Sequence, residues 1–260
     1  MIGDLLSPSV GGVDSAVYGV GTLGMLVGVV VVTWLLRDDA LDAEAGRFRY
    51  LMVIPAFAAL SYAAMTAGIG VFSVNGYEVE GARYLDWLVT TPVLVGYAGH
   101  VVDVDRSVVL GAVGLDATMI LTGFVATTTA GTLRWGAFAV SSLAFLVMLY
   151  VLFVQYPRRA NTTTPERKRL FLRLRNQVGV LWLLYPVIWL ASPVGFGLVS
   201  TLGTAMLVTF MDVAAKVPYT WVVHEHRGIF RFDREATSDD HDAGGLGDRA
   251  GRDAPAATAD

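Results

Sequence analysis

Two groups of ionisable residues lie inside otherwise apolar stretches of the chain. Asp212 and Lys216 are four residues apart, and Arg83 and Asp86 are three apart in an earlier stretch. Residues at these spacings share one face of a helix. A lysine amine in a dry pocket is suited to forming an imine (Schiff base) with an aldehyde, because desolvation favours the neutral nucleophile. Once protonated, that imine is a buried cation, for which the two aspartates supply negative charge.

Plainer interpretations of each group remain open. Asp212 and Lys216 alone could form a structural ion pair, or the ammonium could extend toward the helix end that His224 marks. The polar face of the earlier stretch could be a solvated seam between helices. The four residues together carry two positive and two negative charges when the imine is protonated, and a low-dielectric interior favours such a neutral set.

Aromatic side chains accompany these charges. An aromatic stripe at helical spacing is more often bundle packing than a ligand pocket. On helices that face a buried lysine, however, flat rings would sandwich a long conjugated chain, and prolines within the helices can make room for it. The residues concerned are Trp182, Tyr185, Pro186 and Trp189 in one stretch, Trp87 and Phe138 in two others, and the prolines Pro55 and Pro92.

The elements that must position these residues are membrane-spanning helices. Of the 260 residues, 54% are hydrophobic and 16% are charged, whereas an ordinary soluble domain is about 25% charged. The apolar residues fall in long, largely uncharged blocks, and about 20 such residues cross a bilayer. We predict an all-α bundle of seven transmembrane helices at 15–36, 50–72, 83–102, 107–128, 133–156, 170–192 and 198–223.

Charge predicts the orientation of the bundle. Arginine and lysine gather in the first, third and fifth loops and after the last helix. Cationic loops stay in the cytoplasm, so we expect the N-terminus outside and the C-terminus inside. Residues 1–230 form the predicted membrane domain, and residues 231–260 form a predicted acidic, disordered cytoplasmic tail. Asn75-Gly76 predicts a tight hairpin turn in the second loop.

Several chemistries are excluded or disfavoured. The chain has no cysteine, which rules out disulfides and thiol chemistry. Its four histidines show no metal-ligand spacing within an apolar stretch, so we expect no metal site. Nothing in the sequence indicates nucleic-acid binding, and we expect a protein that is not an enzyme.

Three motifs, in order along the chain, resemble those of the microbial rhodopsins. They are RYLDWLVTTP at 83–92 in the third predicted helix, WLLYPVIW at 182–189 in the sixth, and MDVAAK at 211–216 in the seventh. The resemblance covers essentially all of residues 15–230. It implies a seven-helix protein that binds all-trans retinal covalently at Lys216.

The resemblance also implies roles for individual residues. Asp86 would be the main counterion and proton acceptor, Asp212 the second counterion, and Arg83 the group that tunes both from the outer side. Asp116 would lie near the ionone ring, although a hydrogen-bonded interhelical role is its alternative. Tyr62 and Tyr185 match positions that bind near Asp212, and Trp87, Thr90, Met119, Phe138, Ser142 and Phe145, with Trp182 and Trp189, match or complete the lining of the chromophore.

The family contains outward proton pumps, inward chloride pumps and phototaxis receptors. The acid at Asp86 argues against a chloride pump. The position of a pump's inner proton donor holds Tyr97, and a phenol is a poor donor at neutral pH. The positions of its two outer glutamates hold Val194 and Thr204. These residues favour a phototaxis receptor; a proton pump of low turnover and a structural bundle without a chromophore are the alternatives.

Finer features resemble sensory rhodopsin I, in TPVLVGY at 91–97 and AAKVPY at 214–219. Unlike that family, the fifth and sixth predicted helices hold no histidine, which leaves room for a middle-rhodopsin-like member. The resemblance implies a two-helix membrane transducer as partner, and a homo-oligomer is also open. The acidic tail is typical of salt-loving microbes, so we expect the plasma membrane of a halophilic archaeon. Hydroxyl residues of the last helix could meet the transducer or bond to their own backbone: Ser200, Thr201, Thr204 and Thr209.

Overall fold

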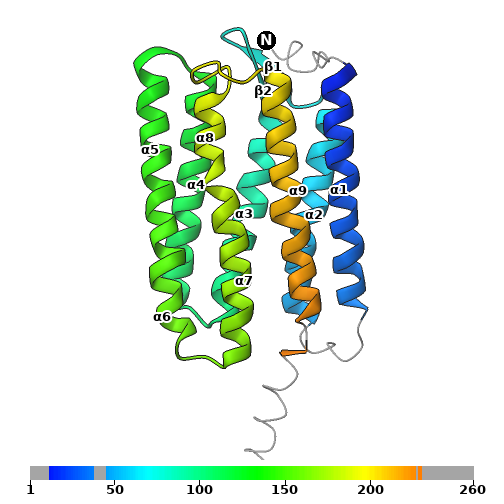
Figure 1. The fold of residues 1–260 in the computed structure, drawn as a ribbon, viewed down its shortest axis with the longest axis vertical. Helices are drawn as coiled ribbons and strands as arrows, with labels where there is room; N and C mark the ends of the chain where they lie inside the picture. Colours follow the sequence, from blue (N-terminus) through cyan, green and yellow to red (C-terminus); the bar gives the residue numbers. More distant parts are fainter. Residues whose placement is uncertain (1–11, 38–44, 227, 230–260) are drawn as a thin grey trace, which may run out of the picture.

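The computed structural model describes residues 12–37, 45–226 and 228–229. These residues form seven helical segments that stand side by side (Figure 1), as the sequence predicts. The predicted tail, 231–260, lies outside the described residues. The segments are α1 (Gly12–Leu36), α2 (Ala45–Thr66), α3 (Gly81–Val101), α4 (Arg106–Thr128), α5 (Gly131–Tyr150) with η3 (Val151–Gln155) and α6 (Tyr156–Ala160), α7 (Pro165–Trp182) with α8 (Leu184–Ala191), and α9 (Thr201–Glu225).

Within the described ranges, five segments are long and apolar enough to cross a membrane: α1, α2, α4, the continuous α5–α6 helix and α9. Of the other two, α3 holds Arg83 and Asp86 among its apolar residues, and α7 begins with a run of basic residues. Large apolar side chains face outward over the bundle, which is the arrangement that lipid requires. Examples are Leu23, Leu60, Leu143, Leu198 and Phe210.

Each of the first five segments packs against the next, and α1 also packs against α9, which closes the ring. α3 contacts α2, α4 and α7, and α7 contacts α9. The three predicted motif segments therefore face one another across the interior of the bundle. The strands β1 (Val71–Val74) and β2 (Tyr77–Glu80) lie at the end of the bundle where α1 begins, here termed the hairpin end (Figure 1).

The hairpin confirms one prediction and corrects another. Val74 pairs with Tyr77, and the two residues between them have positive φ, 54° at Asn75 and 81° at Gly76, as in a type I′ turn. The predicted second helix, 50–72, is too long, because α2 ends at Thr66. Gly68 and Gly70 follow with φ of 73° and 74°, a left-handed conformation that stops a helix.

The sixth segment is divided at Leu183 into α7 and α8. Pro186 lies one turn further along and has no N–H to offer the carbonyl of Trp182, so the helical ladder is interrupted there. The fifth segment contains the wider η3 turn, Val151–Gln155. Such turns are uncommon and are frequent near functional sites.

Candidate functional site

Lys216 and Asp86 form a buried ion pair between α9 and α3. Lys216 Nζ donates to Asp86 Oδ2, and the exposed fractions of the two side chains are 2% and 0%. Thr90 lies one turn beyond Asp86 and its hydroxyl donates to the Asp86 backbone carbonyl at 2.8 Å. The Asp86 carboxylate is therefore in direct contact with the Lys216 nitrogen and can act as its counterion.

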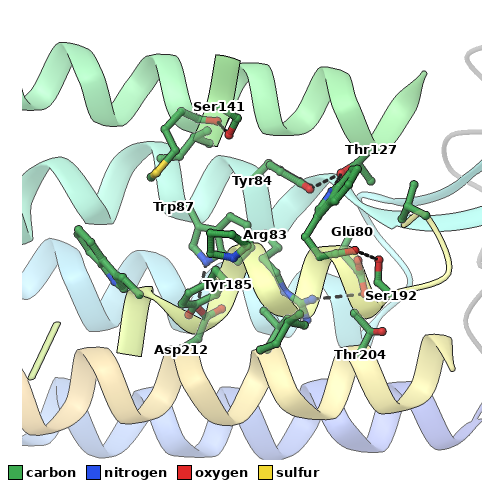
Figure 2. Close-up of a pocket in the computed structure, with 18 of the residues that line it drawn as sticks. Glu80, Arg83, Tyr84, Trp87, Thr127, Ser141, Tyr185, Ser192, Thr204 and Asp212 are labelled. Atoms are coloured by element: carbon green, nitrogen blue, oxygen red, sulfur yellow. Dashed lines mark hydrogen bonds and ion pairs between the residues drawn. The ribbon is translucent and has the colours of Figure 1, made fainter. Parts of the chain in front are cut away.

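Asp212 is held by three donors from three different segments, two of which, Trp87 and Tyr185, appear in Figure 2. Its Oδ2 accepts from the Tyr62 hydroxyl at 2.6 Å. Its Oδ1 accepts from Trp87 Nε1 at 2.9 Å and from the Tyr185 hydroxyl at 2.5 Å. Hydrogen bonds to an ionised acceptor are about twice as strong as neutral ones. The carboxylate of Asp212 is therefore fixed in place by α2, α3 and α8.

Arg83 is balanced from the hairpin end. Its guanidinium lies 3.4 Å from Glu80 Oε1, with side chains 3% and 16% exposed, and donates to Thr209 Oγ1 at 3.5 Å. The Tyr18 hydroxyl donates to the same Glu80 oxygen at 3.0 Å. The guanidinium also lies 5.6 Å from the ring of Tyr18 and 5.8 Å from that of Tyr62. Glu80 is not among the residues predicted for the site, although its i,i+3 spacing from Arg83 is a signal that the sequence contains.

A cavity runs from Lys216 to the hairpin end, where Glu78, Glu80 and Thr204 line it. Burial, followed by the nearby carboxylates of Asp14 and Glu80, raises the pKa of Glu78. Most of the predicted site residues line this cavity; they are Lys216, Asp212, Arg83, Trp87, Met119, Phe138, Ser142, Phe145, Trp182, Tyr185 and Trp189.

Two rings from different segments form a stack in the cavity wall. Phe138 of α5 and Trp189 of α8 have ring centroids 4.3 Å apart at an interplanar angle of 15°. Trp189 Nε1 donates to Thr127 Oγ1 at 2.9 Å, and the Tyr84 hydroxyl lies 2.6 Å from the same oxygen (Figure 2). Thr127 thus joins three segments. In the sequence, nothing distinguishes Thr127 from its neighbours Thr128 and Thr129.

The remaining predicted residues stand behind the cavity wall. Asp86 and Tyr62 reach it through Lys216 and Asp212, as described above. Asp116 Oδ2 accepts from the Thr91 hydroxyl at 2.6 Å, and Thr91 itself lines the cavity. Asp116 therefore makes an interhelical hydrogen bond from α4 to α3, which is the alternative that the sequence left open.

Beyond Lys216, away from the hairpin end, the bundle is packed with apolar and aromatic side chains. Tyr97 is 6% exposed and its ring centroid lies 6.3 Å from that of Tyr219. The Tyr219 hydroxyl donates to the Leu94 carbonyl at 2.9 Å. Among the described residues, the buried carboxylates are Asp86, Asp116 and Asp212. The Asp86 carboxylate thus contacts the lysine, and the rings of Tyr97 and Tyr219 pack beyond it, away from the hairpin end.

Comparisons with known proteins agree with this geometry. Residues 13–229 match the sequence model of the bacteriorhodopsin-like protein family. The chain is 42% identical over 233 residues to sensory rhodopsin-1 of Halobacterium sp. (strain SG1), covering 89% of this chain and 94% of that protein. It is 39% identical over 250 residues to a sensory rhodopsin of Halorubrum sodomense, covering 96% of each. The structure resembles that of a cyanorhodopsin from the cyanobacterium Calothrix sp., with a TM-score of 0.79 and 29% identity, covering 84% of this chain and 96% of that chain.

Proposed function

Because the chain belongs to the bacteriorhodopsin-like family of microbial rhodopsins, we propose that it is a retinal photoreceptor for phototaxis. Its relatives include several haloarchaeal proteins named sensory rhodopsins. Together with the apolar helices, they make it a multi-pass plasma-membrane protein. By the charge of its loops, we place the hairpin end outside, and the end of α6 and the start of α7 in the cytoplasm.

The observation that carries the proposal is the Lys216–Asp86 pair at the wall of an aromatic cavity. The residues present fit retinal, because an amine opens onto a space lined by Trp182, Trp189 and Phe138. Bound covalently to Lys216, all-trans retinal supplies the absorption of visible light and the isomerisation that light drives. Asp86 Oδ2 contacts the Lys216 nitrogen and is placed to accept a proton from it.

The other residues hold the charges of the site. Three donors keep Asp212 fixed, so it can serve as a second counterion without moving. Arg83 is paired with Glu80, which leaves the Asp86 carboxylate to the lysine nitrogen. We propose that the remaining residues that line the cavity pack around the chromophore and exclude water.

A receptor fits the packing around Tyr97 better than a pump does. An outward pump must return a proton to Lys216 from the side opposite to its exit. Here that side holds Tyr97 and Tyr219 in close packing, so proton return is slow and the deprotonated state is long-lived. A slow return favours signalling, and it lowers the turnover of any transport.

The signalling partner that we propose is a membrane transducer with two helices. Of the hydroxyl residues on α9, Thr209 is 5% exposed and accepts from Arg83, so it is not part of a lipid-facing contact. Ser200 accepts from the Gly203 N–H, and Thr204 donates to the Ser200 carbonyl. Thr201 lines the cavity, so we place the transducer contact on the exposed apolar side chains of α9, such as Met206 and Phe210. Co-purification from native membranes tests it, and recovery of the chain without any two-helix membrane protein would refute it.

Light-driven pH change tests the receptor proposal. Cells that express this chain without a transducer, loaded with retinal, should form a visible pigment and show little change of external pH on illumination. Sustained acidification that a protonophore abolishes would replace the receptor with a proton pump.

The attachment of retinal is tested separately with the two lysines of the chain. Lys216→Ala should abolish the visible absorption band, because the nitrogen that holds retinal is lost. Lys168→Ala, the matched control at the start of α7, should keep it. A Lys216→Ala protein with an unchanged visible band would disprove the assignment of retinal to this residue.

A further inference from the structure

The backbone beside Lys216 contains a carbonyl that its own helix cannot fully satisfy. Pro218 lies inside α9, and proline has no N–H to donate to the carbonyl four residues earlier. That carbonyl belongs to Ala214, two residues before Lys216. In the hydrocarbon region of a membrane, a backbone carbonyl without a donor costs several kcal/mol, so a donor from outside the helix is expected here.

Gln177 of α7 supplies that donor. Its Nε2 donates to the Ala214 carbonyl at 3.2 Å and to the Ala215 carbonyl at 3.3 Å. Ala215 directly precedes Lys216. One amide group of α7 is therefore bonded to the two peptide units that carry the retinal-binding residue.

Gln177 lies in α7, the part of the sixth segment that can move relative to α8. α7 is separated from α8 by the break at Leu183, so α7 can change its direction without moving the cavity wall that α8 forms. Arg173 lies four residues before Gln177, on the same face of α7, and its Nη1 lies 3.1 Å from His226 Nε2 just beyond α9. Two residues of α7 thus contact the last segment: Arg173 contacts His226, and Gln177 contacts the backbone next to Lys216.

We propose that Gln177 is a positioning residue that couples the backbone at Lys216 to α7. This inference rests on the proposed photoreceptor function. A light-driven displacement at Lys216 shifts the Ala214 and Ala215 carbonyls, and the amide of Gln177 passes that shift to α7. α7 contains the arginine- and lysine-rich stretch 167–175 near its start. Its displacement therefore reaches the end of the bundle opposite the hairpin.

The experiment measures the movement of α7 with spin labels. The natural chain has no cysteine, so two introduced cysteines give one defined label pair. We choose Arg169→Cys on α7, where the side chain is 70% exposed, and Ser107→Cys at the exposed start of α4. Gln177→Met keeps the length of the side chain and removes its donor. Asn176→Ala is the control, because Asn176 is exposed and its side-chain oxygen accepts from the neighbouring Arg175.

In the labelled parent protein, illumination should change the distance between the labels. Interhelical hydrogen bonds in membranes contribute about 0.6–2 kcal/mol, so Gln177→Met should reduce the light-induced change about three- to thirtyfold. Asn176→Ala should leave it unchanged, and all three proteins should keep their visible band. If Gln177→Met does not form pigment, Gln177→Asn takes its place, because its amide is one methylene too short to reach the carbonyls.

Three results would contradict the inference or its premise. A full distance change in the Gln177 variant would show that α7 moves without this bond. A bleaching pigment whose label distance never changes would show that α7 does not move at all. Failure of the parent chain to form any pigment with retinal would instead overturn the photoreceptor function, and the absorption spectrum separates that result from the other two.

Discussion

Removing the charge of Asp86 from the retinal-free protein should strongly destabilise the bundle. Lys216 and Asp86 are 2% and 0% exposed, and breaking a buried pair by removing one partner costs about 3–5 kcal/mol. Asp86→Asn should therefore lower the free energy of unfolding by about that amount. The matched control is Asp105→Asn. Its ion pair with Arg159 is exposed, at 57% and 49%, and such pairs contribute about 0–1 kcal/mol.

A double-mutant cycle separates the pair from the rest of the site. Lys216→Met should also destabilise the protein, because Asp86 then loses its partner. The double variant removes both charges, so its loss should fall short of the sum of the single losses by at least about 2 kcal/mol. The assay is unfolding of the retinal-free proteins in mixed micelles by an increasing fraction of SDS, followed by circular dichroism. Additive single losses, or an Asp86→Asn loss no larger than that of Asp105→Asn, would refute the buried ion pair.

Two further substitutions test the packing around the site. A Cβ on Gly21 would lie 2.3 Å from Cδ1 of Tyr62, so Gly21→Ala should displace that ring and lower the free energy of unfolding by about 1–3 kcal/mol. Gly111→Ala, with nothing within 4 Å of its Cβ, should be neutral or stabilising by up to about 1 kcal/mol, and equal thermal midpoints would contradict the predicted clash. Thr91→Val should cost about 1–3 kcal/mol because Asp116 loses its donor, and an unchanged thermal midpoint would show that this hydrogen bond is dispensable.

The helices could be predicted because their signals are local. Long apolar runs indicate a span wherever they occur, and Asn75-Gly76 specifies its turn through backbone conformation alone. The end of α2 was predicted wrongly, because residues 67–72 are apolar enough to continue a helix. Gly68 and Gly70 in this stretch take positive φ. The mean hydropathy of a stretch carries no information about backbone conformation.

The site was predicted in part, for the same reason. Spacings of three and four show which residues share a helix face, so Lys216, Asp212 and Asp86 could be grouped. They do not show which face meets which, so the pairing of Arg83 with Glu80 was missed. The contact of Gln177 with α9 depends on the height of one helix against another, and a single sequence carries no measure of that height.

The unequal sides of Lys216 have an electrical consequence. On the hairpin side, a cavity with Glu78 and Glu80 in its wall connects the lysine to the end of the bundle, whereas Tyr97 and Tyr219 fill the other side. A proton that leaves and returns through the hairpin side crosses the same part of the transmembrane voltage in opposite directions, so the electrical work, about 2.3 kcal/mol per elementary charge per 100 mV for a full crossing, cancels over the cycle. The complete light cycle then moves no net charge across the bilayer, so sensing light neither draws on the cell's membrane potential nor adds to it.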